Sequence, residues 1–366
     1  MSHALFSPIR LAGLELPNRI AVSPMCQYSA NDGVASDWHF THLGMLANSG
    51  AAMVVVEMTD VERHGRISHG CLGLYSDACE AGLARVIDHC RRIGSAKFSI
   101  QLAHAGRKGS ALRPWEGNKP LGPDQDPWPT IAPSAIPFGP GWPAPREMET
   151  EDLDRVRDAF AAAAARAVRI GFDAIELHAA HGYLIHEFLS PVSNRRGDRY
   201  GGDLQARLRY PLEIVAAVRE VVPTGTPLGA RMTGHDWVDG GLTPDDAVLI
   251  AQAFKEAGID YVDVSSGGIS SQARPPDTPC YNAPFSERVG REAGISTRTV
   301  GLIVTPAQAD EIVATGKADM VALARGFLDN PHWAWQAAAA LGAEVARPPQ
   351  YERATPKVWP GAKLAV

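Results

Sequence analysis

Two imidazoles and one phenol follow a short apolar run in the middle of the chain. The stretch 173–183 begins as a strand-like segment and then carries His178, His181 and Tyr183 within six positions. Imidazole and phenol groups donate hydrogen bonds and move protons in enzyme sites. A strand that ends in such a cluster predicts a site of proton chemistry, with the rest of the chain as its scaffold.

The spacing of the two histidines has more than one chemical interpretation. His178 and His181 could bind a metal ion, but this needs a third ligand, and Glu176 lies two residues away along the strand. Two neutral imidazoles could instead each donate an N–H to one substrate oxygen and stabilise negative charge that develops there. Histidines that are simply hydrogen-bonded in the core are a third interpretation, which three polar groups at one strand end make weaker.

Strand and helix patterns alternate along the chain on both sides of this cluster. Amphipathic segments predict helices, among them 77–92, 151–170 and 204–222, and Thr243-Pro244 and Thr305-Pro306 are typical helix starts. Between the helices lie eight short apolar runs, which predict strands buried on both faces at 19–25, 53–59, 97–103, 173–179, 227–233, 261–266, 299–303 and 320–324.

Eight strand–helix repeats predict an α/β fold, the (β/α)8 TIM barrel. An open doubly wound sheet is the alternative, but no GxGxxG motif follows the first strand, which favours the barrel. The connection at 104–149 is crowded with Pro, Gly and Trp and is much longer than a turn. Because it follows the third strand, this insertion is expected to cap the catalytic face.

The last two strand ends carry residues suited to an anion. In a barrel the active site lies at the carboxyl ends of the strands, and the loops after strands seven and eight often bind phosphate. Gly301 lets a backbone N–H approach an anion, and Arg325 beside Gly326 offers a guanidinium fork that matches phosphate oxygens. A phosphorylated ligand is therefore expected, against the alternative of a tight glycine turn and a surface arginine.

Composition argues against several classes of function. The 366 residues carry a net charge of −6 and no basic tail, so no nucleic-acid partner is expected. No signal peptide is apparent and no apolar run approaches the roughly 18 residues of a membrane helix, so no membrane partner is expected. Five cysteines without a CxxC pair are typical of a reduced, cytoplasmic chain. No linker divides residues 1–366, which predicts a single domain.

Six motifs, in order through nearly the whole chain, resemble one family. They lie at 18–28, 101–108, 132–135, 176–184, 198–202 and 324–331, and include Pro-Met-Cys-Gln-Tyr after the first strand and His-Ala-Ala-His-Gly-Tyr after the fourth. Each short match alone is weak, but the ordered set is specific. The sequence resembles the Old Yellow Enzyme family of FMN-dependent ene-reductases, and most closely its bacterial thermophilic-like subclass, which includes xenobiotic reductases.

This resemblance implies FMN as the cofactor and NADPH or NADH as the co-substrate. The phosphate of FMN would meet Gly301 and Arg325, the pyrimidine edge of its ring would meet Gln101, and Arg231 would lie near N1 and O2. The full set of implied cofactor contacts is Ser23, Pro24, Met25, Cys26, Met58, Gln101, Arg231, Gly301, Arg325 and Gly326.

The resemblance also implies the reaction, which is reduction of an activated C=C bond in an α,β-unsaturated carbonyl or related small molecule. His178 and His181 would hold the substrate oxygen, Tyr183 would donate the proton, and Tyr28 would help to bind the same oxygen or shape the pocket. Hydride would come from flavin N5, in a ping-pong sequence with NAD(P)H. The alternative is a flavin-independent phosphate-binding barrel aldolase or isomerase, for which Lys108 is a candidate Schiff-base lysine.

The C-terminal segment, about 345–366, resembles a tail that carries an arginine across a dimer interface into the neighbouring active site. This predicts that Arg353 contacts substrate in a homodimer or homotetramer. Two positions depart from the family pattern. Ala354 replaces the usual glycine and aromatic ending, and Met58 replaces a small residue near the flavin, where its side chain could narrow the pocket or turn away.

Overall fold

Eight parallel strands close into a barrel, so the prediction of a (β/α)8 fold is confirmed. The computed structural model describes residues 3–355 and 357–363, and the predicted tail therefore lies partly outside the described residues. Around the barrel the strand order is β10-β11-β12-β3-β4-β5-β8-β9. The bounds are β3 (Ile20–Val22), β4 (Met53–Asp60), β5 (Lys97–Ala103), β8 (Ala174–Ala179), β9 (Leu228–Thr233), β10 (Tyr261–Ser265), β11 (Ser296–Val300) and β12 (Met320–Leu323).

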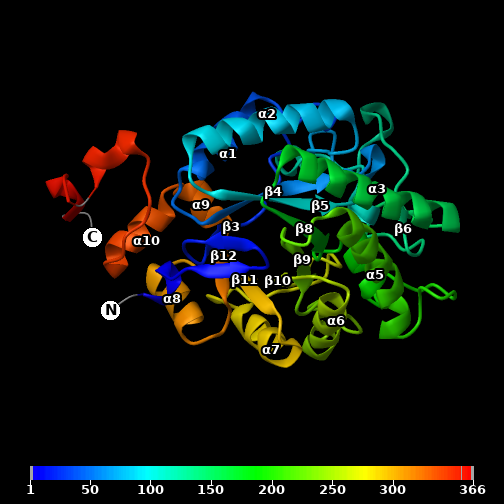
Figure 1. Cartoon of the computed structure of the whole chain (residues 1–366). Helices are drawn as coiled ribbons and strands as arrows, with labels where there is room; N and C mark the ends of the chain where they lie inside the picture. The colour runs from blue at the N-terminus through cyan, green and yellow to red at the C-terminus, as the bar shows by residue number, and fades with distance from the viewer. Residues whose placement is uncertain (1–2, 356, 364–366) are drawn as a thin grey trace.

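Helices surround this barrel and bury its outer face (Figure 1). Their starts follow the capping pattern in the sequence, since Asp203, Thr243 and Thr305 each accept a hydrogen bond from a first-turn backbone N–H. Among the described residues, no helix has the length and apolar character that crossing a membrane requires. The helices are α1 (Asp37–Ala47), α2 (Asp77–Ile93), α3 (Thr150–Ile170), α4 (Leu184–Leu189), α5 (Leu204–Val221), α6 (Pro244–Glu256), α7 (Ala283–Ala293), α8 (Pro306–Ala314), α9 (Arg325–Asp329) and α10 (Trp333–Leu341).

A small hairpin closes one end of the barrel. Strands β1 (Ile9–Leu11) and β2 (Leu14–Leu16) pair in antiparallel fashion, and Leu11 and Leu16 pack in one apolar cluster with Met53, Tyr261 and Met320. Those three residues begin β4, β10 and β12, so the hairpin covers the mouth where the strands start. A ligand must therefore enter at the carboxyl ends of the strands.

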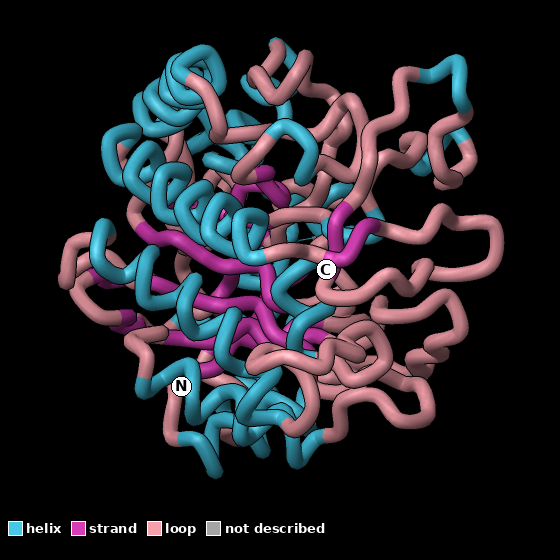
Figure 2. The backbone as a smooth tube through the Cα atoms, turned by 90° about the vertical axis from the view of Figure 1, so that its right-hand side faces the viewer, coloured by secondary structure: helices cyan, strands magenta, loops and turns pink. Residues whose placement is uncertain are grey.

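The predicted insertion at 104–149 lies over that open end. It contains three short 3-10 helices and a two-residue parallel pair, β6 (Ile131–Ala132) and β7 (Arg146–Glu147). Arg107 fastens it by donating to the backbone carbonyls of Ile136, Pro137 and Ile269. Figure 2 shows long loops gathered beyond one end of the strands. The insertion is thus tied to the loop after β10 by a buried arginine.

Candidate active site

The two imidazoles and the phenol converge where β8 ends. His178 is the penultimate residue of β8, His181 lies in the turn that follows, and Tyr183 precedes α4. The ring centroid of His178 is 5.1 Å from that of His181 and 4.9 Å from that of Tyr183. His178 is only 4% exposed, whereas His181 and Tyr183 keep part of their surfaces open. The structure therefore brings the three predicted groups together at the carboxyl end of the barrel.

Both imidazoles are neutral at physiological pH. Burial, followed by the nearby charge of Arg231, holds the pKa of His178 and of His181 well below the usual value for histidine. The backbone N–H of Ala180 donates to Nδ1 of His178 at 3.3 Å. Because a neutral imidazole carries one proton, this contact places it on Nε2. His178 can therefore donate a hydrogen bond from Nε2 to a ligand.

His181 is oriented by the end of β10. Its Nε2 lies 2.7 Å from Oγ of Ser265, the last residue of that strand. When the serine hydroxyl donates, the imidazole proton is on Nδ1, which has no partner among the described residues and can donate to a ligand. The backbone at His181 is left-handed, with φ of 58°. Gly182 follows with φ of 74°, and a Cβ there would meet the carbonyl oxygen of Gly268 at 2.2 Å.

Tyr183 keeps its proton. Burial raises the pKa of its phenol well above the usual value. The ammonium of Lys108 lies 4.8 Å from the Tyr183 ring centroid and 4.7 Å from that of Phe138 in the insertion. Lys108 also donates to the carbonyl oxygens of His181 at 2.8 Å and Gly268 at 3.3 Å. The phenol therefore stays protonated and can act as a proton donor.

Residues from the first two barrel strands line the same space. Cys26, Tyr28 and Tyr183 pack on one apolar cluster that contains Met58. Met58 is 2% exposed and follows a register shift in the pairing of β4 with β5, so its side chain fills this cluster rather than turning to solvent. Burial, reinforced by Glu57, raises the pKa of the Cys26 thiol well above its usual value, and burial likewise raises the pKa of Tyr28. Both groups are protonated at neutral pH.

Charged groups fill the barrel interior beneath these residues. Gln101 donates through Nε2 to Oε1 of Glu176 at 2.9 Å, and Arg298 pairs with the second oxygen of Glu176. Asp263 lies 3.1 Å from Nη2 of Arg298 and 3.2 Å from Nε of Arg231. Glu176 is therefore fully engaged inside the barrel and does not serve as a third metal ligand beside the histidines. Arg298 and Asp263 were not predicted from the sequence.

The adjacent ends of β11 and β12 form the predicted phosphate region. Gly301 directly follows β11 and has φ of 125°, and a Cβ there would lie 2.8 Å from Nδ2 of Asn282. Arg325 opens α9 with an exposed side chain, and the described residues include no hydrogen-bond or ion-pair partner for it. Gly326 follows it. Ser23, at the end of β3, has a buried Oγ that no described residue satisfies. These features fit a ligand with an anionic end and polar ring atoms.

Four other residues of the matching motifs and the tail have the following surroundings. His104 is buried and turns to Oε1 of Glu62 at 2.9 Å, away from the imidazole pair. Arg353 lies in an exposed 3-10 segment, Pro349–Ala354, at the C-terminal end of the chain. Pro24 and Met25 are half-buried in the loop after β3.

Comparison with known proteins agrees with this geometry. Residues 4–344 match the family described as NADH:flavin oxidoreductase / NADH oxidase. The chain is 44% identical over 355 residues to an NADPH dehydrogenase of Geobacillus thermodenitrificans, covering 96% of this chain and 99% of that protein. It is 43% identical over 352 residues to an NADPH dehydrogenase of Listeria innocua, covering 96% and 98% respectively.

A solved structure of morphinone reductase in complex with tetrahydroNAD superposes with a TM-score of 0.77 and 28% identity, covering 94% of this chain and 93% of that one. The similarity therefore extends over nearly the whole length of both chains. On these matches the chain belongs to the NADH:flavin oxidoreductase / NADH oxidase family, the Old Yellow Enzyme family that its motifs resemble.

Proposed function

We propose that this protein is an FMN-dependent NAD(P)H oxidoreductase that reduces activated C=C bonds. The observation that carries the proposal is the cluster at the end of β8, where two neutral imidazoles and a protonated phenol meet beside an open barrel mouth. A metal site would need a third ligand beside the two histidines, and Glu176 is instead bound to Gln101 and Arg298. Two N–H donors and one O–H donor instead suit an oxygen that gains negative charge while a nearby carbon gains a proton.

The residues around the mouth fit FMN. Gly301, Arg325 and Gly326 would hold its phosphate, and Arg231 and Gln101 would face the polar edge of its ring. The remaining ring contacts would come from Ser23, Pro24, Met25, Cys26 and Met58. When bound, the flavin accepts hydride from NAD(P)H and passes it to the substrate carbon. We take residues 1–366 as a single FMN-binding unit, supported by the family match over 4–344.

The protein side chains supply orientation and the proton. Nε2 of His178 and an N–H of His181 would hold a carbonyl or nitro oxygen, which makes the β-carbon electrophilic. Tyr183 would protonate the α-carbon, so that one hydride and one proton together saturate the C=C bond. Tyr28, in the same cluster, would border the substrate oxygen. Both electrons come from NAD(P)H, so the reaction needs no other reductant.

NADPH is the proposed reductant, and the names of the relatives support it. The two curated relatives are NADPH dehydrogenases, and morphinone reductase was solved with tetrahydroNAD. The aldolase or isomerase alternative loses its support in the geometry of Lys108. The Lys108 Nζ donates to two carbonyl oxygens and lies over two aromatic rings, contacts that give it a role in holding the site in place.

Flavin uptake tests the proposal directly. Apoprotein mixed with FMN is expected to turn yellow and to bleach anaerobically when NADPH is added. Arg325→Ala should bind FMN about 10–10²-fold more weakly, because a charge-assisted contact to phosphate is lost, while the affinity for riboflavin stays unchanged. Isothermal titration with both flavins measures this difference. Apoprotein that binds neither flavin would end the proposal.

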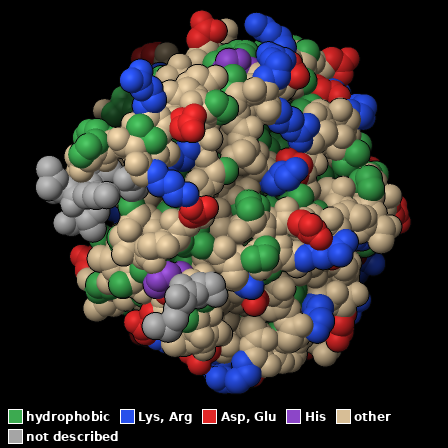
Figure 3. All heavy atoms as spheres, turned by 60° about the vertical axis from the view of Figure 1, so that its left-hand side comes forward, with side chains coloured by type: hydrophobic (Ala, Val, Ile, Leu, Met, Phe, Trp, Pro, Cys, Tyr) green, Lys and Arg blue, Asp and Glu red, His purple; other side chains and the backbone are tan. Residues whose placement is uncertain are grey.

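We also propose a homodimer or homotetramer in which Arg353 reaches the site of a neighbouring chain. The support is its exposed position in the tail and the resemblance of that segment to an interface arm. On the face shown in Figure 3, basic and acidic side chains are interspersed.

Arg353→Ala is then expected to raise the KM for the C=C substrate several-fold, or to shift the oligomer toward monomer. Lys357→Ala is the matched control, since this tail lysine pairs within its own chain with Glu344 at 2.6 Å. Light scattering and steady-state kinetics measure both effects. An unchanged oligomer together with an unchanged KM would rule the role out.

A further inference from the structure

The turn between His181 and Tyr183 is strained and is held from two sides. His181 and Gly182 both have left-handed backbone, with φ of 58° and 74°. On one side Lys108 donates to the carbonyl oxygen of His181 at 2.8 Å. On the other side the backbone N–H of Gly182 donates to Nδ1 of His186 at 2.8 Å. This turn carries one of the proposed oxygen-binding groups and is followed at once by the proposed proton donor.

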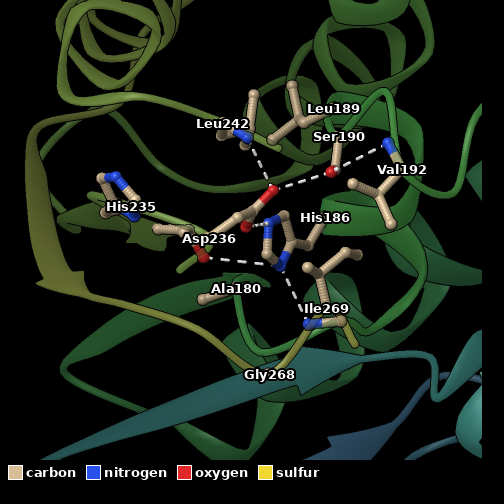
Figure 4. A network of polar contacts seen from close by, with 12 residues as sticks. Ala180, His186, Leu189, Ser190, Val192, His235, Asp236, Leu242, Gly268 and Ile269 are labelled. Carbon is tan, nitrogen blue, oxygen red and sulfur yellow. Dashed lines mark hydrogen bonds and ion pairs between the residues drawn. The ribbon is translucent and has the colours of Figure 1, made fainter. Parts of the chain in front are cut away.

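A buried polar relay stands behind Gly182 (Figure 4). Nε2 of His186 lies 2.9 Å from Oδ1 of Asp236, and both side chains are 0% exposed. Oδ2 of Asp236 accepts from the backbone N–H of Leu242 at 2.7 Å and from Oγ of Ser190 at 2.7 Å. Neither Nε2 of His186 nor Oδ1 of Asp236 has another hydrogen-bond partner among the described residues. The relay therefore runs from the loop after β9 to the turn after β8.

We propose that Asp236 and His186 are positioning residues that set the orientation of the turn carrying His181 and Tyr183. This inference rests on the proposed function of those two side chains. Neither Asp236 nor His186 reaches solvent, so they act through the Gly182 N–H and touch no substrate. Without an acceptor, the Gly182 N–H would be buried and unsatisfied, and the turn would relax toward another conformation.

The relay works only with one arrangement of protons. Burial alone would raise the pKa of Asp236, but the hydrogen bonds from His186, the backbone N–H of Leu242 and Ser190 outweigh it and leave the pKa below the usual value. Asp236 is thus a carboxylate that can only accept hydrogen bonds. His186 consequently keeps its proton on Nε2, which leaves Nδ1 free to accept from Gly182.

Asp236→Asn would reverse this arrangement of protons on His186, although the Asn side chain has almost the same shape as Asp. The backbone N–H of Leu242 is a fixed donor, so the new amide must place its oxygen there and its NH2 toward His186. That NH2 group forces Nε2 of His186 to accept, which moves the imidazole proton to Nδ1. Nδ1–H then faces the N–H of Gly182, and the turn loses its contact.

The experiment compares holoenzyme variants in three measurements besides folding, namely kcat/KM, the Kd for a phenol and the Kd for FMN. Asp236→Asn and His186→Leu are expected to lower kcat/KM for the C=C substrate about 10²-fold, because misplacement of reacting groups by about 1 Å has this effect. Their Kd for 4-hydroxybenzaldehyde, a phenol whose oxygen would bind to the oxygen clamp formed by His178 and His181, should rise about tenfold, which corresponds to one hydrogen bond. Their Kd for FMN should stay within about twofold, since the relay contacts none of the flavin residues.

His186→Gln and Tyr210→Phe complete the set. A Gln amide offers one acceptor and one donor, so it should restore most of the lost kcat/KM and phenol affinity. Tyr210→Phe keeps the ring that packs on Phe188 but removes a buried hydrogen bond to the carbonyl oxygen of Leu153, which is not part of the relay. It should lower the melting temperature without changing kcat/KM or the phenol affinity. Asp236→Asn and His186→Leu that behave like Tyr210→Phe would overturn the inference.

The two proposals fail in different ways. If wild-type holoenzyme binds no phenol and reduces no activated C=C bond, the proposed function is wrong. If wild type does both, and Asp236→Asn keeps wild-type phenol affinity and kcat/KM, only the positioning role is wrong.

Discussion

Tyr183→Phe is expected to lower the turnover of C=C reduction about 10²–10⁴-fold, the usual range for loss of a general acid. Burial holds the phenol in its protonated form, and the ring packs against His178 with centroids 4.9 Å apart. Phe keeps the ring and that packing but removes the proton. The reduction of bound flavin by NADPH requires no proton from this side chain, so its rate should stay within about threefold of wild type.

Stopped-flow measurement of the two half-reactions separates these effects. The oxidative half-reaction with a cyclic enone should slow, while the reductive half-reaction should not. Tyr28→Phe is the matched control, because Tyr28 is the other phenol that packs on the Met58 cluster. If Tyr28→Phe slows the oxidative half-reaction more than Tyr183→Phe does, the proton comes from Tyr28 and the assignment to Tyr183 is wrong.

The sequence was sufficient to predict the barrel, because most of its strands are short apolar runs that can be recognised locally. Seven of the eight predicted ranges overlap their strands closely, but the seventh, at 299–303, is wrong by three residues, since β11 is Ser296–Val300. The start of β11 is polar and contains Arg298, a residue type that is normally found on the surface. Arg298 is buried only because Glu176, 122 positions away, and Asp263 neutralise it inside the barrel. No local pattern contains that pairing.

The same distinction between local patterns and long-range contacts applies to the candidate site. The proposed chemical groups, such as His178 and Tyr183, lie at or just after the end of a strand and are conspicuous by residue type. The groups that hold them were not predicted, since Asp236 meets His186 across 50 positions and two different loops. The sequence suggests Lys108 only as a candidate Schiff-base lysine. Its carbonyl partners, His181 and Gly268, follow other strands and cannot be inferred from the residues around it. Sequence patterns therefore reveal the groups that do chemistry better than the contacts that position them.

His178→Ala and His181→Ala are each expected to lower kcat/KM for enone reduction about 10²–10³-fold, by analogy with the loss of one donor to a developing oxyanion. Both imidazoles are neutral, so each contributes an N–H and not a charge. The two donors hold one oxygen, and the double variant should therefore lose less than the product of the single losses. Titration with 4-hydroxybenzaldehyde should show the same order of affinities.

Replacement of His181 by asparagine tests whether His181 acts as an N–H donor. His181→Asn retains an amide N–H and should recover at least tenfold of the kcat/KM lost in His181→Ala, whereas a role in charge or metal binding would gain nothing from the amide. Ser265→Ala should have a smaller effect in the same direction, since Oγ of Ser265 orients Nε2 of His181 at 2.7 Å. Phenol affinity that is unchanged in the double alanine variant would contradict the oxygen clamp formed by His178 and His181, because that variant lacks both proposed N–H donors.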